Sequence, residues 1–433
     1  MKFKTYSLQN YKTIPQISQL SKKEISNIDV VSHVLPFKTN NYVVDELIDW
    51  DNYETDPIYK IVFPQKEMLI PRHFEQMESV INSGAGIIDI RETAKQIRLQ
   101  LNPHPAGQLE HNVPEINGEK LLGIQHKYDE TMLFFPTQGQ TCHSYCTFCF
   151  RWPQFVGMDE LKFAMKQGEL MVEYLKNHDE ITDILFTGGD PMVMKTKYLE
   201  SYINPLLEAD LPNLRNIRIG TKSLTFWPNR FIDDEDSSDL LKLFDKVAKS
   251  NKNLAIMSHF NHPNELETRL LEKAVQNIKN TGAIIRTQSP ILNNINAEPE
   301  IWSELWNKQV GLGMIPYYMF IARNTGAQHY FSIPLVKTLQ IFREAYSNVS
   351  GICRTVRGPS MSADPGKVLI SGIATINGTK VIVLTFIQGR NSNWVRRPFF
   401  AKYDENAIWL NNLVPAFGEK EFFYEKEFRA MYK

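Results

Sequence analysis

Short apolar runs alternate with longer amphipathic segments between residues 126 and 325. In one of these segments, Leu161–Leu175, apolar residues recur with helical spacing. Another, Leu266–Ile278, lies between Pro263 and Gly282, which are typical start and stop signals. Six runs have the length of strands: Thr131–Phe135, Ile181–Phe186, Leu214–Ile219, Leu254–His259, Gly282–Thr287 and Met314–Phe320. This alternation predicts an α/β fold, a partial (β/α)6 TIM-like barrel, with a doubly wound sheet as the alternative.

The segments on either side of this core have different patterns. Residues 1–125 predict an N-terminal extension of mixed helical and irregular structure, with helical periodicity from Pro71 to Gln100 interrupted at Gly84-Ala-Gly86. Residues 326–433 predict a C-terminal region with a helix at Leu335–Tyr346 and a hairpin at Ile373–Leu384. Asn377-Gly378, between two β-rich runs, is a strong hairpin signal. We therefore expect three regions, 1–125, 126–325 and 326–433.

Composition narrows the class of protein. The 433 residues include 48 basic and 49 acidic side chains, giving a net charge of −1. This balance gives no sign of a nucleic-acid or anionic-membrane partner. No apolar stretch reaches the roughly 18 residues of a spanning helix, and the first residues lack the apolar core of a signal peptide. We expect a cytoplasmic protein.

Three of the four cysteines lie within eight residues, in the pattern Cys142-x3-Cys146-x2-Cys149. Thiolates at this spacing can converge on one inorganic cluster, and three of them leave one iron of a [4Fe–4S] cluster open. A structural zinc site is the competing interpretation, but it needs four ligands, commonly as two separated pairs. The fourth cysteine, Cys353, has no assigned role.

The cysteine pattern, with Phe148 before the last cysteine, resembles the signature of the radical S-adenosylmethionine (SAM) superfamily. The resemblance implies that SAM binds the open iron and is cleaved to a 5′-deoxyadenosyl radical, with an electron supplied by a donor such as flavodoxin or ferredoxin. It also implies a SAM-binding role for a glycine-rich motif after the second strand: Thr187, Gly188, Gly189 and Asp190.

From about Asn102 to Gly389 the chain resembles the lysine 2,3-aminomutase family, which moves an α-amino group to the β-carbon of an amino acid. The resemblance rests on motifs in order: Gly123–Tyr128, Cys149-Phe-Arg151, Arg218–Lys222, Ser258–Glu265, Gln288-Ser289 and Pro316-Tyr-Tyr318. It implies that Arg151 binds the substrate α-carboxylate, as a bidentate guanidinium can. It also implies that Gln288 contacts the SAM nucleoside. Hydrogen-bonding imidazoles remain the better interpretation of His259 and His262 than a metal pair.

The family also uses pyridoxal 5′-phosphate (PLP), held by a lysine. Lys367, in Asp364-Pro-Gly-Lys367, is the candidate, although this loop lacks the longer glycine run of lysine enzymes. Lys127 and Tyr128 match positions near the PLP phosphate, with a lysine where the family has an arginine. A plain exposed lysine in a Pro-Gly turn is the alternative.

Arg323 ends the segment Pro316–Arg323 at a position where lysine enzymes carry an aspartate that pairs with the substrate's terminal ammonium. A buried like-charge contact would cost several kcal/mol. We therefore expect a small-molecule substrate that is an amino acid other than free lysine, with an acidic or polar neutral end, unless Arg323 points away from the pocket.

The leading hypothesis is thus a PLP-dependent radical SAM aminomutase, an isomerase that could form a homo-oligomer. The alternatives are a radical SAM enzyme of the same family that has lost PLP, and a non-catalytic iron–sulfur protein.

Overall fold

The centre of the molecule is an eleven-stranded sheet in the order β15-β14-β13-β12-β11-β10-β9-β8-β7-β6-β5. A computed structural model describes residues 1–432. The six middle strands are parallel and follow the chain order. They are β6 (Thr131–Phe134), β7 (Asp183–Phe186), β8 (Asn216–Thr221), β9 (Asn253–His259), β10 (Ile284–Ile291) and β11 (Ile315–Ile321). The six predicted strands are all confirmed.

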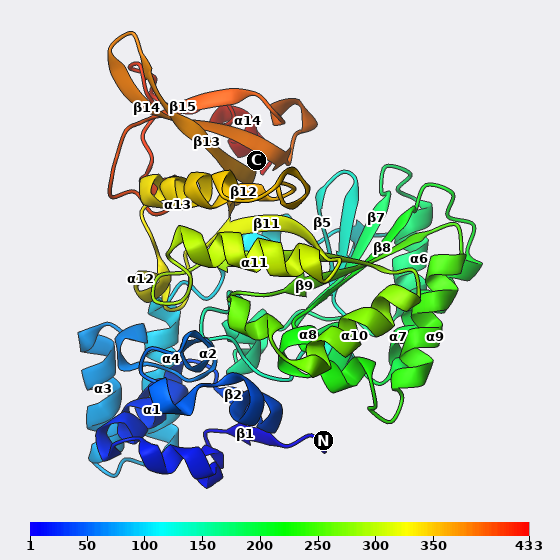
Figure 1. The fold of residues 1–433 in the computed structure, drawn as a ribbon. Helices are drawn as coiled ribbons and strands as arrows, with labels where there is room; N and C mark the ends of the chain where they lie inside the picture. The colour runs from blue at the N-terminus through cyan, green and yellow to red at the C-terminus, as the bar shows by residue number, and fades with distance from the viewer. Residues whose placement is uncertain (433) are drawn as a thin grey trace.

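Helices follow these strands along the chain and cover the convex face of the curved sheet (Figure 1). The long ones are α6 (Gly168–Lys176), α7 (Thr196–Glu208), α9 (Ser237–Lys249), α10 (Arg269–Asn280), α11 (Pro299–Gly311) and α13 (Leu335–Ser347), and the short α8 (Ser223–Phe226) and α12 (Gln328–Phe331) lie in loops. The sheet does not close on itself, because β6 pairs with the antiparallel strand β5 (Ile124–Tyr128) and β11 pairs with β12 (Arg357–Ser362). The core is therefore the predicted partial (β/α)6 barrel.

Side chains alternate between the two faces of the barrel strands, as strand geometry requires. On β8, Ile217 and Ile219 are buried in the core beneath the helices, whereas Arg218 is only half-buried. On β10, Ile285 is buried in the same core and Arg286 and Gln288 are half-buried. The inner face of the barrel therefore carries polar and charged groups rather than the packed aliphatic layers of a closed TIM barrel.

Two predicted boundaries differ from the structure. The helix expected from Leu161 begins at Gly168, because Met165 instead pairs with the barrel segment that follows β6: its amide donates to Phe135 O, and its carbonyl accepts from Thr137 N. Met165 therefore packs as extended chain. Strand β10 continues to Ile291, so Gln288 lies inside the strand and not at its end.

The C-terminal region extends the sheet beyond β12. It contains β13 (Gly366–Ile376), β14 (Thr379–Gly389), β15 (Pro398–Lys402) and the short helix α14 (Glu425–Ala430). The predicted hairpin joins β13 to β14, and Asn377 and Gly378 both have positive φ, +49° and +77°. Its apolar face packs against α13 around Leu335, Leu339 and Phe386.

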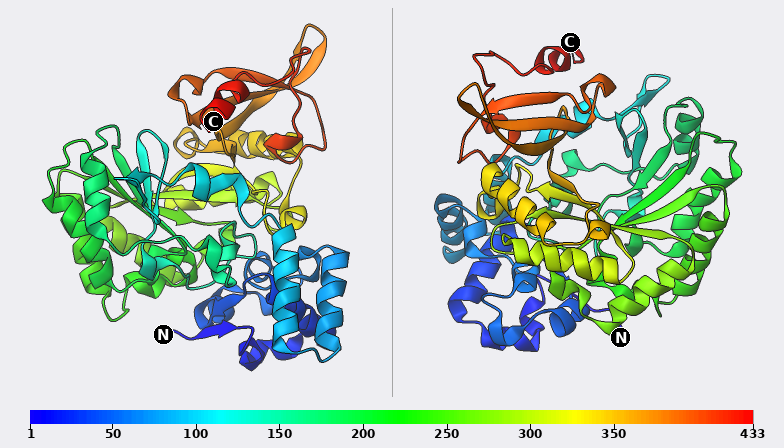
Figure 2. Two further views of the ribbon diagram at one scale, coloured as in Figure 1. Left: turned by 180° about the vertical axis from the view of Figure 1, so that it is seen from behind. Right: turned by 45° about the horizontal axis from the view of Figure 1, so that its top comes forward.

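The N-terminal region is helical and has its own apolar core. It comprises β1 (Thr5–Ser7), β2 (Lys38–Asn40), α1 (Lys22–Val34), α2 (Pro57–Val62), α3 (Pro71–Asn82) and α4 (Ile87–Gln100); α5 (Gln108–His111), β3 (Glu115–Ile116) and β4 (Glu119–Lys120) lead into the barrel. The helical break expected at Gly84-Ala-Gly86 separates α3 from α4. The views of Figure 2 place this region and the C-terminal sheet on opposite sides of the barrel.

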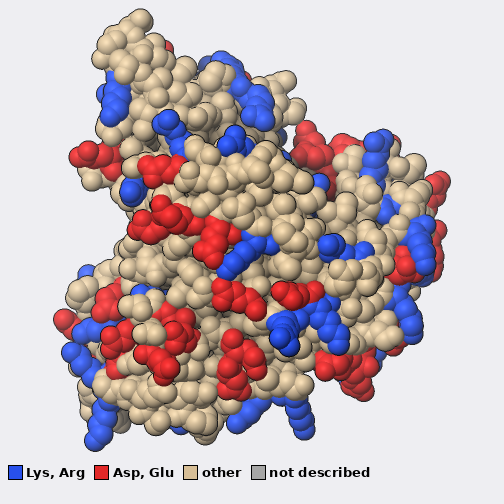
Figure 3. Space-filling view, viewed as in Figure 1, with Lys and Arg blue, Asp and Glu red and all other residues tan. Residues whose placement is uncertain are grey.

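The surface has no extended field of one sign on the face seen in Figure 3, where acidic and basic side chains are interspersed. Among residues 1–432, none of the helices combines the length and the apolar character that a membrane-spanning segment requires.

Candidate active site

Cys142, Cys146 and Cys149 lie in the loop that follows the carboxyl end of β6, and the N-terminal region holds this loop in place. The amide of Tyr145 donates to Lys38 O at 2.8 Å, and the amide of Thr147 donates to Ile61 O at 2.8 Å. Asn40 Nδ2 donates to His143 O at 3.1 Å. The three contacts span the length of the loop, so the N-terminal region shapes the cysteine site. Sequence reasoning missed this role because contacts between such distant segments leave no periodic signal.

The thiols are poorly solvated. Burial raises the pKa of all three, and the pKa of Cys142 is raised further by the nearby Asp190 carboxylate. Desolvation disfavours the thiolate forms of these cysteines, and a bound cationic metal centre would stabilise them as thiolates. The donor chemistry therefore fits an iron–sulfur cluster.

The spacing of the sulfurs bears on the zinc alternative. Tetrahedral zinc with bonds of about 2.3 Å would place its thiolates about 3.8 Å apart. In the part of the chain that the structure describes, the group of three ligand atoms that all lie within 4.8 Å of one another is His126, His178 and Glu180, and not the three cysteines. At least one pair of the cysteine sulfurs is therefore more than 4.8 Å apart, which is wider than a single tetrahedral zinc ion requires.

The segment Thr187–Asp190 follows β7 and packs directly against the cysteine loop. A Cβ on Gly189 would lie 2.4 Å from Thr141 O, and a Cβ on Gly188, whose φ is +146°, would lie 2.4 Å from Gln140 Nε2. Glycine is required here because two backbones touch. This contact fixes the glycine-rich segment beside Cys142.

Both oxygens of the Asp190 carboxylate accept hydrogen bonds from the protein. It accepts hydrogen bonds from Thr221 Oγ1, Ser223 Oγ and the amides of Met192 and Lys222, at 2.7–3.0 Å. Burial raises its pKa despite these bonds. Asp190 thus clamps the loop after β7 to the loop after β8, a positioning task that the resemblance did not indicate.

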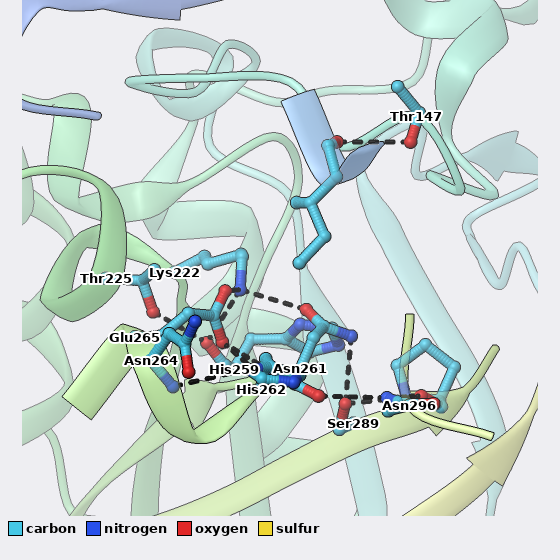
Figure 4. A network of polar contacts seen from close by, with 12 residues as sticks. Thr147, Lys222, Thr225, His259, Asn261, His262, Asn264, Glu265, Ser289 and Asn296 are labelled. Atoms are coloured by element: carbon cyan, nitrogen blue, oxygen red, sulfur yellow. Dashed lines mark hydrogen bonds and ion pairs between the residues drawn. The ribbon is translucent and has the colours of Figure 1, made fainter. Parts of the chain in front are cut away.

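A buried ion pair joins the next two loops (Figure 4). Lys222 Nζ lies 2.6 Å from Glu265 Oε1 and also donates to Asn261 Oδ1 at 3.0 Å. The other Glu265 oxygen accepts from the amides of Asn261 and His262, and Asn261 Nδ2 donates to Ser289 Oγ on β10 at 2.9 Å. Three of the motifs that carried the family resemblance therefore meet in one network. Sequence reasoning gave Lys222 and Glu265 no role; their polarity at strand ends was the available signal.

His259 connects this network to the cysteine loop. Its ring stacks on Phe148, with centroids 6.0 Å apart. Burial and, to a smaller extent, the neighbouring Lys222 ammonium lower its pKa to about 3, so the imidazole is neutral. The described residues around His259 and His262 do not form a three-ligand metal group.

Arg151 and Arg323 form a pair of half-buried cations beside the cysteines. The Nε atoms of both are buried without a hydrogen-bond partner among the described residues. Burial lowers the pKa of each guanidinium to about 10. Each lies over a ring, Arg151 over Phe135 at 4.4 Å and Arg323 over Phe150 at 4.9 Å. Buried donors without a partner indicate an anion-binding position, because a buried donor that makes no hydrogen bond destabilises the protein.

Lys367 is the second residue of β13, inside the hairpin and not before it. Its Nζ donates to Gln388 Oε1 at 2.6 Å and lies 4.8 Å from the ring of Tyr318. Burial and the charges of Arg218 and Arg357 lower its pKa to about 7. The loop therefore turns this lysine toward the barrel strands. Lys367 is not the exposed turn lysine of the alternative interpretation.

The groups around Lys367 include unpaired donors. The Tyr318 hydroxyl and Arg357 Nη2 are buried without a partner among residues 1–432, and the Arg357 guanidinium lies 4.2 Å from the Tyr318 ring. Lys127 donates to Ala363 O at 2.5 Å, and its pKa is lowered well below the usual value, chiefly by burial. Tyr128 lies beside both amines, 5.5 Å from each Nζ. This donor set fits a phosphorylated aldehyde held by an amine.

Gln288 is the register partner of Tyr318 on β11 and so lies beside the groups around Lys367. Gln288 is on the inner face of β10, next to His259 in the strand register. Cys353 is buried under the outer helices, where its thiol donates to Asn307 Oδ1 at 3.3 Å, and it belongs to the packing there.

Known proteins with similar sequences indicate the family of this chain. No family model matches the chain. A putative L-lysine 2,3-aminomutase from Aquifex aeolicus is 33% identical over 357 residues, which cover 82% of this chain and 83% of that protein. A glutamate 2,3-aminomutase from Clostridioides difficile is 25% identical over 292 residues, 67% of this chain and 64% of that protein.

Among solved structures, a radical SAM methyltransferase from Sphaerobacter thermophilus aligns with a TM-score of 0.39 and 16% identity, over 67% of this chain and 94% of that one. On the similarity to the Aquifex protein, which spans most of both chains, this protein belongs to the lysine 2,3-aminomutase family of enzymes.

Proposed function

We propose that the protein is a PLP-dependent radical SAM aminomutase that moves the α-amino group of an amino acid to its β-carbon. The observation that carries this proposal is the Lys367 amine, whose pKa is lowered to about 7 beside unpaired donors from Tyr318 and Arg357. A neutral amine attacks an aldehyde, whereas an ammonium does not. This favours retention of PLP over the alternative in which the family chemistry persists without it.

The two cofactor sites would lie at two ends of the polar interior of the barrel. Cys142, Cys146 and Cys149 would hold a [4Fe–4S] cluster with one open iron for SAM, with Gly188, Gly189 and Gln288 as candidate contacts to SAM. Lys367 would hold PLP, with Lys127, Tyr128 and Arg357 toward its phosphate. When bound, these groups would supply a 5′-deoxyadenosyl radical and an imine through which nitrogen can migrate.

The protein's own task is to bind, orient and exclude water. Charged groups lie close to one another between the two ends: Cys149 and Arg323 shift the pKa of Arg151, and Arg323 and Lys367 shift the pKa of Lys127. A substrate that spans this path would have its α-carboxylate held by Arg151. Lys367 would be the residue that holds the cofactor beside the substrate, and the buried ring of Phe135 would exclude water.

Arg323 supports a choice of substrate. Its Nε is buried without a hydrogen-bond partner among the described residues, and its charge lowers the pKa of Arg151. Two such cations would repel the terminal ammonium of lysine and attract a carboxylate or a polar neutral group. We infer a substrate with such a side chain, and the amino acid itself would enter as a free small molecule.

The test is anaerobic incubation of the reconstituted protein with SAM, PLP, a strong reductant and each common amino acid, scored for β-amino acid products by mass spectrometry. We expect a product from an acidic or polar amino acid and none from lysine. Lys367→Ala should abolish it, while Lys380→Ala, at an exposed lysine of the same hairpin, should not. Full activity of Lys367→Ala, or efficient conversion of lysine, would overturn the proposal.

A further inference from the structure

Three metal-ligand side chains meet at the end of the barrel opposite the cysteines. His126 lies on β5, His178 follows α6, and Glu180 precedes β7. One ligand atom from each lies within 4.8 Å of the other two. The turn from α6 leads to the amino end of β7, whereas the cysteines follow the carboxyl end of β6. The two groups are therefore separate sites.

Hydrogen bonds to backbone carbonyls set the tautomer of both imidazoles. His178 Nδ1 lies 2.8 Å from Tyr174 O, and His126 Nε2 lies 3.1 Å from Asp129 O. A carbonyl oxygen can only accept, so these nitrogens carry the hydrogens. The lone pairs are left on His178 Nε2 and His126 Nδ1. Metal-binding histidines use this arrangement, in which the second nitrogen donates to a carbonyl and orients the ring.

The surroundings hold the two rings in this orientation. Tyr174 stacks on His178, with centroids 3.8 Å apart, and its hydroxyl lies 2.8 Å from His126 Nδ1. His126 and His178 are half-buried, and Glu180 is exposed. The site is thus ordered on its protein side and open to solvent on the other, which gives an ion a path of entry.

We propose that His126, His178 and Glu180 bind one divalent transition-metal ion of the zinc class, with water in the fourth position and with the Tyr174 hydroxyl giving up its hydrogen bond to His126 Nδ1 when the ion binds. Two imidazoles and one carboxylate are a common zinc donor set, and three protein ligands leave one position open. The ion links β5 to the α6–β7 turn. Since Lys127 and Tyr128 follow His126 on β5, it also steadies the strand that carries them. This proposal does not depend on the proposed reaction.

Zinc titration of the full-length, cluster-reconstituted protein against a chromophoric chelator tests the site. The wild type should bind one equivalent of Zn²⁺, and His178→Gln and Glu180→Gln should each weaken that binding at least about tenfold. His33→Gln is the matched control, because His33 Nδ1 makes the same bond to a carbonyl four residues earlier, at 2.8 Å from Asp29 O, and His33 belongs to no three-ligand group among the described residues. Wild-type binding in His178→Gln and Glu180→Gln would overturn the proposal.

A variant that lacks all three cysteines, Cys142→Ser/Cys146→Ser/Cys149→Ser, distinguishes zinc bound at the proposed site from zinc bound by the cysteines. It should retain the zinc equivalent; loss of the equivalent would assign the ion to the cysteines and overturn the proposal. As a second readout, Zn²⁺ should raise the Tm of the wild type and of His33→Gln but not of Glu180→Gln, whose exposed side chain can be replaced without unfolding the chain. An equal rise in Glu180→Gln would contradict the site.

Discussion

Lys367 on β13 donates a hydrogen bond to the amide oxygen of Gln388, its register partner on β14, with 2.6 Å between the two atoms. The Gln388 amide nitrogen in turn donates to Glu130 Oε1, also at 2.6 Å. The position of the amine is therefore set by the C-terminal hairpin and by the residue that precedes β6. In this arrangement the hairpin aims the proposed PLP lysine at the barrel.

Replacing Gln388 by Leu should weaken PLP binding about tenfold, because a hydrogen bond that orients an amine contributes about 1–2 kcal/mol. Titration of the apoprotein with PLP, followed by the absorbance of the bound cofactor, measures this. Thr385→Ala is the control: Thr385 pairs with Ser371 across the same hairpin and has no contact with Lys367. Equal affinities of Gln388→Leu and the wild type would show that the amide does not position the lysine.

The rate of PLP attachment should depend on pH with a midpoint near 7. The pKa of Lys367 is lowered to about 7 by burial and by Arg218 and Arg357, so the amine is protonated and unreactive below this pH and neutral above it. The rate should rise from pH 6 to pH 8 and then level off. Stopped-flow absorbance gives the profile. A rate that keeps rising tenfold per pH unit toward pH 10 would mean that the lysine has its ordinary pKa.

Glu265→Leu should lower the free energy of unfolding by about 3–5 kcal/mol, because it leaves the Lys222 ammonium buried without its carboxylate. The side chains of Lys222 and Glu265 are 9% and 0% exposed. The double variant Lys222→Met/Glu265→Leu should recover part of the loss. Chemical denaturation monitored by circular dichroism measures both.

The exposed pair Lys242–Asp239 provides a comparison, since Asp239→Ala should change stability by less than about 1 kcal/mol. A double variant no more stable than Glu265→Leu would contradict the assignment of the loss to an uncompensated charge.

Gly189→Ala should reduce the iron content of the reconstituted protein, because the new Cβ would meet the Thr141 backbone at 2.4 Å and displace the cysteine loop. Iron and sulfide assays with visible absorbance report this. Gly372→Ala, where a Cβ would meet nothing within 4 Å, should bind iron as the wild type does. Full iron content in Gly189→Ala would show that the loop tolerates the displacement.

Hydrophobic periodicity was sufficient to locate the six barrel strands, because alternation of inner and outer positions leaves a direct trace in the sequence. It misplaced the start of α6 because Leu161 ends a short 3-10 helix and Met165 pairs with the segment that follows β6, a tertiary contact without a local signal.

Some site residues were likewise visible in the sequence, and others were not. A short motif revealed the cysteines, whereas the Lys222–Glu265 pair, the clamp by Asp190 and the backbone contacts from Lys38 and Ile61 depend on segments far apart in the chain. Such contacts become visible only when the fold brings these residues together.

The most direct test of the central claim follows the nitrogen itself. The reconstituted protein is supplied with SAM, PLP, reductant and the amino acid converted in the substrate panel, labelled with ¹⁵N at the α-amino group, and the product is examined by NMR. We expect ¹⁵N bonded to the β-carbon, with no such product from Lys367→Ala. Cleavage of SAM without movement of ¹⁵N, or movement of ¹⁵N in Lys367→Ala, would contradict it.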